Sequence, residues 1–146
     1  MLKNVDPLLS AELLFVLKSM GHGDEILICD RNHPAASIAK HTTYGKVVPM
    51  PGTALPTLSR ALLWHFPLDT FVDAPITRME VVGDAAELVL AHHDMQEIAD
   101  AAEGRPVLIR ALERFAFYEA ARRSFAVVQT DDPGPYGCFL LKMGVI

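Results

Sequence analysis

Two ionisable side chains flank one short apolar run near the start of the chain. His22 lies between Gly21 and Gly23, and Asp30 directly follows the run 26–29. An imidazole titrates near neutral pH, so it can both give and take a proton. A carboxylate that ends a buried strand must reach solvent or find hydrogen-bond donors. The stretch therefore offers a proton-transfer group and a hydrogen-bonding group, provided that the fold builds a pocket there.

Both residues also have ordinary structural explanations. The helix dipole favours a histidine just beyond a helix end, which accounts for His22 about as well as a catalytic role does. Asp30 is explained equally well as a solvated strand-end carboxylate. If it does face a pocket, Asp30 would form with Asn32 and His33 a polar cluster suited to hydroxyl groups.

A second set of candidates lies in the last third of the chain. Arg114 begins a helical segment, and Tyr118 adds a phenol about one turn later. Arg114 fits either a solvated position or a site. Tyr136, Gly137 and Cys138 follow a proline-rich turn, where a glycine allows a backbone to approach a ligand closely. The alternative for Tyr136 is that it simply covers the edge of the core.

Metal, nucleotide and serine-hydrolase chemistry find little support in the sequence. The chain has 6 histidines, but His92 and His93 are adjacent and would point about 100° apart on a helix, so they are poor joint ligands. No HExxH pattern, phosphate-binding glycine loop or GxSxG turn occurs. We therefore expect neither a metal nor a cofactor.

Composition limits the remaining classes. The chain has 146 residues, 51% of them hydrophobic and 21% charged, which predicts one folded domain over residues 1–146. A net charge of −5 without basic clusters argues against nucleic acid or an anionic membrane as partner. The 2 cysteines have no CxxC spacing, and neither a signal peptide nor a membrane span is recognisable, so we expect a cytoplasmic protein.

The elements that would position these residues alternate between helices and short apolar strands. This alternation predicts an α/β fold, a three-layer sandwich with a mixed sheet, in which ligand sites collect at strand ends. We expect helices over 11–20, 38–40, 55–65, 94–102 and 113–123, and strands over 25–30, 46–50, 70–73, 77–82, 107–110, 125–130 and 136–142.

Several motifs, in this order along nearly the whole chain, resemble one known family. They resemble the L-fucose mutarotase family, which is related to the D-ribose pyranase family. The motifs are Gly21–Glu25 with Asp30, Phe66–Asp69, Glu113–Glu119, Tyr136–Gly137 and Leu140–Val145.

The resemblance implies a cofactor-independent interconversion of sugar anomers. His22 matches the family's catalytic histidine, and Asp30 and Arg114 match positions that hold sugar hydroxyls. The segment from Tyr136 to Cys138 matches a three-residue sugar-binding segment. This chain departs from the family at Cys138, where fucose mutarotases carry asparagine, and a thiol hydrogen-bonds more weakly than an amide. The departure bears on which sugar binds.

The resemblance also implies a homo-oligomer, with a ring-shaped decamer among the candidate assemblies and with sites near subunit contacts. His33 and Tyr118 are further pocket candidates, and His33 would influence which sugar fits. L-fucose is the expected substrate. The alternatives are a ribose-pyranase-type or other sugar mutarotase and a saccharide-binding protein without catalysis.

Overall fold

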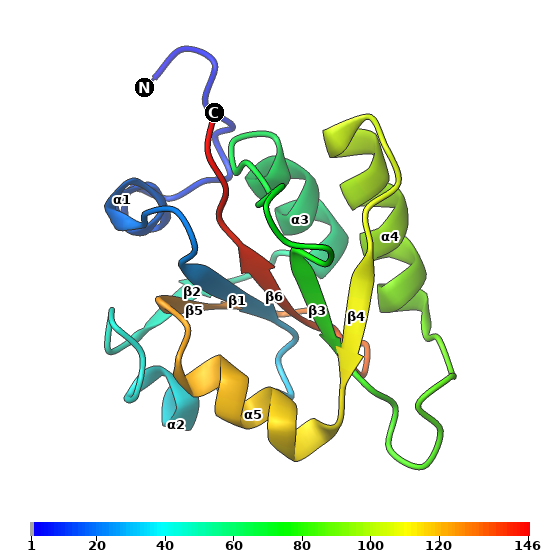
Figure 1. Ribbon diagram of the computed structural model, residues 1–146. Helices are drawn as coiled ribbons and strands as arrows, with labels where there is room; N and C mark the ends of the chain where they lie inside the picture. The colour runs from blue at the N-terminus through cyan, green and yellow to red at the C-terminus, as the bar shows by residue number, and fades with distance from the viewer. Residues whose placement is uncertain (1) are drawn as a thin grey trace.

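A six-stranded sheet forms the middle layer of the computed structural model, which describes residues 2–146 (Figure 1). The strands are β1 (Glu25–Cys29), β2 (Val47–Met50), β3 (Ile76–Met79), β4 (Ile109–Leu112), β5 (Ala126–Thr130) and β6 (Cys138–Lys142). The helices are α1 (Ala11–Ser19), α2 (Ala35–Ala39), α3 (Leu55–Leu63), α4 (Leu90–Glu103) and α5 (Arg114–Arg122).

The order of the strands in the sheet is β2-β5-β1-β6-β3-β4. β1 pairs in parallel with β5, as do β2 with β5 and β3 with β4. β6 pairs antiparallel with both β1 and β3, so it alone runs in the opposite direction. Five strands therefore end at one edge of the sheet, where β6 begins.

Strand β1 is the centre of the sheet. Its residues Ile26 to Cys29 are fully buried, which fits an apolar run covered on both faces. Cys29 pairs directly with Cys138 of β6. This register sets Asp30, the next residue of the chain, beside Gly137, and their backbones exchange a hydrogen bond in which Asp30 N donates to Gly137 O at 2.8 Å.

Helices cover both faces of the sheet, as Figure 1 shows. Leu13 of α1, Leu58 of α3 and Met95 of α4 belong to the larger core cluster on one face. Ile38 of α2 and Phe117 of α5 belong to the smaller cluster on the other. The predicted three-layer α/β sandwich with a mixed sheet is confirmed. Within residues 2–146, no helix is long and apolar enough to cross a bilayer.

One predicted strand is wrong. Residues 70–73 form a bend, because the Asp69 side chain accepts a hydrogen bond from Phe71 N at 3.0 Å and turns the chain. The next strand begins only at Ile76. A second difference is in β4, which starts at Ile109, two residues after the predicted start at Val107.

Candidate functional site

Asp30 lies at the carboxyl end of β1 and is buried, with 2% of its surface exposed. Its Oδ1 accepts hydrogen bonds from Asn32 N at 2.7 Å and from His33 N at 3.2 Å, an arrangement typical of an aspartate that closes a turn. Its Oδ2 accepts from Gly137 N at 2.9 Å. Burial raises the pKa of the carboxyl group, while these backbone donors act in the opposite direction. The carboxylate is thus fixed by backbone groups rather than by a basic side chain.

The turn before β6 carries Tyr136 and Gly137 to this carboxylate. Tyr136 adopts a left-handed backbone with φ of 58°, and its hydroxyl accepts a hydrogen bond from Val82 N at 3.1 Å. A Cβ on Gly137 would lie 2.8 Å from Leu55 Cδ2 and 3.4 Å from Asp30 Cβ. A larger residue at 137 would therefore displace the Leu55 side chain and press against Asp30.

Cys138 and His33 meet beneath the carboxylate. The Cys138 thiol donates to Asp30 Oδ2 at 3.5 Å, and its Sγ lies 3.2 Å from Nδ1 of His33. Burial raises the pKa of the Cys138 thiol, and burial lowers the pKa of His33 to about 4. At neutral pH both groups are uncharged, a thiol beside a neutral imidazole.

Helix α5 supplies a cation and a phenol. Arg114 is its first residue, and the guanidinium lies over the Phe115 ring with 4.7 Å between Cζ and the ring centroid. Its Nε is buried and has no hydrogen-bond partner in the described chain. The ring of Tyr118 packs edge-on against His33, and burial raises the pKa of its hydroxyl. An unpaired donor of this kind fits an oxygen-rich ligand.

These groups line a cavity of about 290 Å³ at the edge where the five strands end. The cavity brings together six of the predicted site residues. Gly137 is not among the lining residues, but its backbone N–H donates a hydrogen bond to the Asp30 carboxylate. It is lined by Asp30, Asn32, His33, Met79, Val82, Arg114, Tyr118, Pro135, Tyr136 and Cys138.

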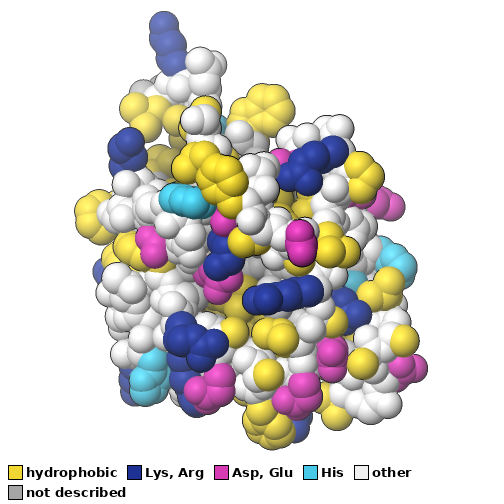
Figure 2. Space-filling view, in the orientation of Figure 1, with side chains coloured by type: hydrophobic (Ala, Val, Ile, Leu, Met, Phe, Trp, Pro, Cys, Tyr) yellow, Lys and Arg dark blue, Asp and Glu magenta, His cyan; other side chains and the backbone are white. Residues whose placement is uncertain are grey.

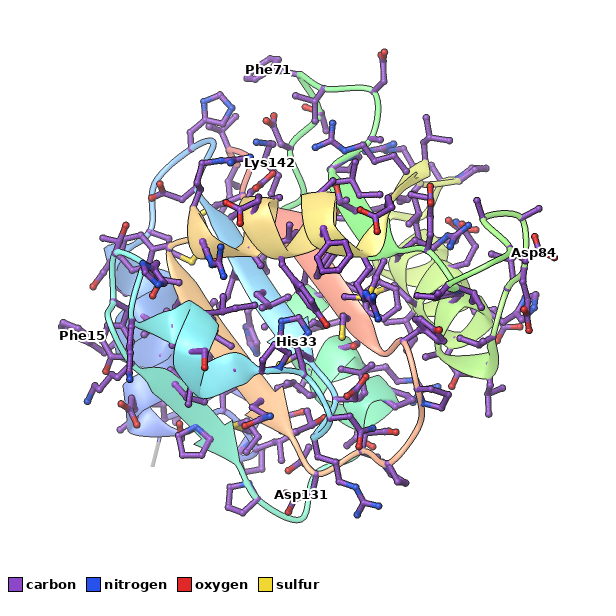
Figure 3. All side chains as sticks on the ribbon, turned by 90° about the horizontal axis from the view of Figure 1, so that it is seen from below. Phe15, His33, Phe71, Asp84, Asp131 and Lys142 are labelled. Atoms are coloured by element: carbon purple, nitrogen blue, oxygen red, sulfur yellow. The ribbon has the colours of Figure 1, made fainter. Side chains whose placement is uncertain are left out.

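His22 is not in this cavity. It lies before the amino end of β1, where its Nε2 is 3.2 Å from Asp69 Oδ1 and its ring stands edge-on to Phe71. At about 3.3 Å per residue, β1 alone separates His22 from Asp30 by roughly 13 Å or more. In Figure 3, Phe71, which contacts the His22 ring, lies at one rim, and His33 lies near the middle of the face that carries α2 and α5. The expectation that His22 and Asp30 share one pocket within a chain is wrong.

The surroundings of His22 form a second polar group, which we call the His22 edge: His22, Asp69 and Phe71. The His22 side chain is 44% exposed, whereas that of Asp69 is 4% exposed. The hydrogen bond from Phe71 N, and then His22, hold the pKa of Asp69 below its ordinary value. Sequence reasoning missed Asp69 as a partner of His22, although it lies in a motif that carried the resemblance.

Three lining residues were also missed, namely Met79, Val82 and Pro135. Met79 ends β3 and Val82 follows it, and both are ordinary apolar residues without a sequence signal for a site. A further hollow of about 390 Å³ lies between α3 and α4, lined by Trp64, Ile98 and two alanines with Arg60 and Glu97 as its charged groups. It holds none of the predicted residues. Within residues 2–146, no three His, Cys, Asp or Glu side chains are placed to hold a metal ion.

Comparison with known proteins adds independent findings. A model described as the RbsD / FucU transport protein family matches residues 3–146. Fucose mutarotase of Homo sapiens is 41% identical over 148 residues, which cover 99% of this chain and 94% of that protein. L-fucose mutarotase of Glaesserella parasuis serovar 5 (strain SH0165) is 40% identical over 146 residues, covering 99% and 96%.

A solved structure agrees with the sequence comparison. The fucose mutarotase of Streptococcus pneumoniae, determined in complex with L-fucose, superposes with a TM-score of 0.89 at 34% identity and covers 99% of each chain. The family predicted from the sequence motifs is thereby confirmed. Since the family model spans nearly every residue and the relatives match along their whole length, the chain belongs to the RbsD / FucU transport protein family.

Proposed function

We propose that the chain is a cofactor-independent sugar mutarotase, an isomerase that interconverts the α and β anomers of a monosaccharide, with L-fucose as substrate. The observation that carries this proposal is the cavity at the strand ends. It holds a fixed carboxylate, Asp30, and an arginine with an unpaired buried Nε, Arg114. Both suit a ligand made of hydroxyl groups. The reaction proposed, interconversion of sugar anomers, is the one for which the similar fucose mutarotases are named.

Anomer exchange requires two proton transfers. One proton goes to the ring oxygen and another leaves the anomeric hydroxyl; the open aldehyde then rotates and closes on its other face. Each general acid or base step contributes typically about 10²–10⁴-fold. In this proposal His22 serves as the proton-transfer group, while Asp30, Arg114 and the segment from Tyr136 to Cys138 hold the sugar.

His22 can serve this role only in the cavity of another copy of the chain, because the cavity of its own chain lies at the opposite end of β1. Its side chain contacts Asp69 but is 44% exposed, so it can also contact a neighbouring copy of the chain. The chain also exposes large apolar residues over several elements, which is common at subunit contacts; Figure 2 shows such side chains at several places on one face. They include Phe15, Trp64, Phe71, Leu90, Leu108 and Phe115. We therefore include a homo-oligomer, ring-shaped in the decameric form, in the proposal.

Anomer exchange measured by saturation-transfer NMR tests the reaction. L-fucose, D-ribose, D-galactose and L-rhamnose are each tested at equilibrium with and without protein, and acceleration is expected to be greatest for L-fucose. His22→Ala should remove most of it. His93→Ala, an exposed histidine outside both groups, is the matched control and should leave the rate unchanged.

Mixed oligomers test the contribution of a second chain. His22→Ala and Arg114→Ala each lack one part of the site, so each alone should be nearly inactive. Co-expressed and co-assembled, they should recover a measurable part of the wild-type rate, because some sites then combine an intact His22 with an intact Arg114. Mixed oligomers verified by mass spectrometry that recover no activity would contradict a site shared between chains.

A second candidate is a saccharide-binding protein without catalysis. The observation that favours it is that one chain holds the cavity without His22. Tight saccharide binding with no acceleration for any of the four sugars would select this alternative.

The compartment is part of the same proposal. Cys29 and Cys138 are both free thiols, and both are buried. Free thiols fit a reducing cytoplasm. Retained activity in strong reductant is the expected result.

A further inference from the structure

His33 is a buried histidine with one unused ring nitrogen. Only 6% of the residue is exposed, and its side chain lines the cavity. Nδ1 lies 3.2 Å from Sγ of Cys138, whereas Nε2 is buried and has no hydrogen-bond partner among the described residues. Buried polar atoms are almost always paired, so an unpaired one on a residue that lines a cavity indicates a place for a ligand atom.

The hydrogen bonds around Cys138 assign the state of the imidazole. The thiol proton is directed to Asp30 Oδ2, which leaves the sulfur lone pairs for the neighbouring ring. We therefore assign the His33 proton to Nδ1, which donates to Sγ. Because burial keeps this imidazole neutral at pH 7, Nε2 then carries a free lone pair and is an acceptor.

The ring is held firmly on its other sides. It stands edge-on to Phe117 at 6.2 Å and to Tyr118 at 5.4 Å between centroids. The His33 backbone N–H donates to Asp30, and its carbonyl accepts from Gln129 Nε2 at 3.2 Å. A ring fixed in this way holds Nε2 in one orientation, so the position of a hydrogen-bonding group that satisfies it is defined.

We propose that Nε2 of His33 accepts a hydrogen bond from one hydroxyl group of the bound monosaccharide, with Cys138 positioning the ring. The His33–Cys138 pair then determines which sugars bind well, because a sugar that lacks that hydroxyl, or carries it on the other face, leaves Nε2 unpaired. This inference deepens the proposed function and rests on it.

Binding of deoxy sugars to wild type and to His33→Phe tests the inference. The ligands are L-fucose and its 2-, 3- and 4-deoxy analogues, and the dissociation constants are measured by titration. In wild type, loss of the hydroxyl that faces His33 should weaken binding by about 3- to 10-fold, the range of one neutral hydrogen bond. His33→Phe should weaken L-fucose binding similarly. In that variant, removal of the same hydroxyl should have no further effect, whereas the other positions should lose as much as in wild type.

Two variants of Cys138 test the positioning role. Cys138→Ser keeps a donor and an acceptor beside Nδ1 and should retain the wild-type pattern of losses. Cys138→Ala removes the acceptor, so the ring loses its orientation and the position-specific loss should shrink. Thermal unfolding of each variant establishes that it is folded, and a structural defect alone would weaken all four ligands equally.

The outcomes separate this inference from the proposed function. If wild type neither binds nor exchanges L-fucose, the proposed function fails and the inference fails with it. If wild type exchanges L-fucose but His33→Phe shows the wild-type pattern at every position, only the inference is overturned.

Discussion

The two ends of strand β1 carry two histidines with opposite surroundings. His22 is about half exposed, pairs with the Asp69 carboxylate and lies beside an exposed aromatic ring. His33 is buried, contacts a thiol and is enclosed by two aromatic rings. The first environment leaves an imidazole open to solvent and to other molecules; the second keeps it neutral and fixed. This difference suits His22 to proton transfer and His33 to recognition.

Replacement of His22 should have the largest effect on rate. His22→Ala should slow anomer exchange by about 10²–10⁴-fold if the histidine supplies one acid or base step. His33→Phe should change the maximal rate far less than it changes binding. Saturation-transfer NMR at saturating L-fucose measures both. A larger loss of maximal rate in His33→Phe than in His22→Ala would reverse the two assignments.

Asp30 should affect both stability and binding. In Asp30→Asn, the NH2 group of the new side chain must point either at Gly137 N–H or at the backbone N–H groups of Asn32 and His33. At least one buried donor therefore loses its acceptor. The expected loss is about 1–3 kcal/mol in the free energy of unfolding. Urea denaturation measures it.

Asp69→Asn is the matched change at the His22 edge and retains an Oδ1 acceptor for Phe71 N. It should be milder than Asp30→Asn. Both aspartates are buried, but Asp30 accepts backbone hydrogen bonds through both carboxylate oxygens and Asp69 through Oδ1 alone. Equal losses at the two ends would show that the number of backbone donors does not set the loss.

Much of the cavity was predictable because strand ends and sheet register follow from local sequence. Asp30 follows one apolar run and Gly137 precedes another, which predicts two strand ends. The pairing of these two strands brings Tyr136 and Cys138 close to Asp30. The contact between His33 and Cys138 spans 105 residues and has no local signal.

The misplacement of His22 has a simple physical origin. His22 and Asp30 are close in sequence, but an extended strand lies between them and carries its two ends to opposite edges of the sheet. Nearness along the chain therefore does not mean nearness in space here. The strand length alone would have predicted their separation.

Acid should destabilise the protein through buried imidazoles. Burial lowers the pKa of both His33 and His92 to about 4. Between about pH 4 and 6.5 the unfolded chain binds protons at these rings that the folded chain does not, so the free energy of unfolding rises with pH across this window. Each ring contributes a slope of at most about 1.4 kcal/mol per pH unit. Asp30, whose pKa is raised, opposes this trend at the acidic end.

Urea denaturation from pH 4.5 to 7.5 measures that slope. His33→Phe and His92→Phe should each reduce it, and the double variant should reduce it most. A wild-type slope retained in the double variant would place the acid sensitivity elsewhere.

The smallest expected effect is a gain in stability. His33→Phe removes a buried acceptor that has no partner in the unliganded chain, so the variant should be about 1 kcal/mol more stable than wild type at pH 7. Its weaker sugar binding should reduce the additional stabilisation that L-fucose gives to wild type. Melting temperatures with and without L-fucose measure both quantities. A buried group that lowers the stability of the free protein and raises the stability of the complex is retained for its ligand. A His33→Phe variant less stable than wild type would show instead that His33 stabilises the fold.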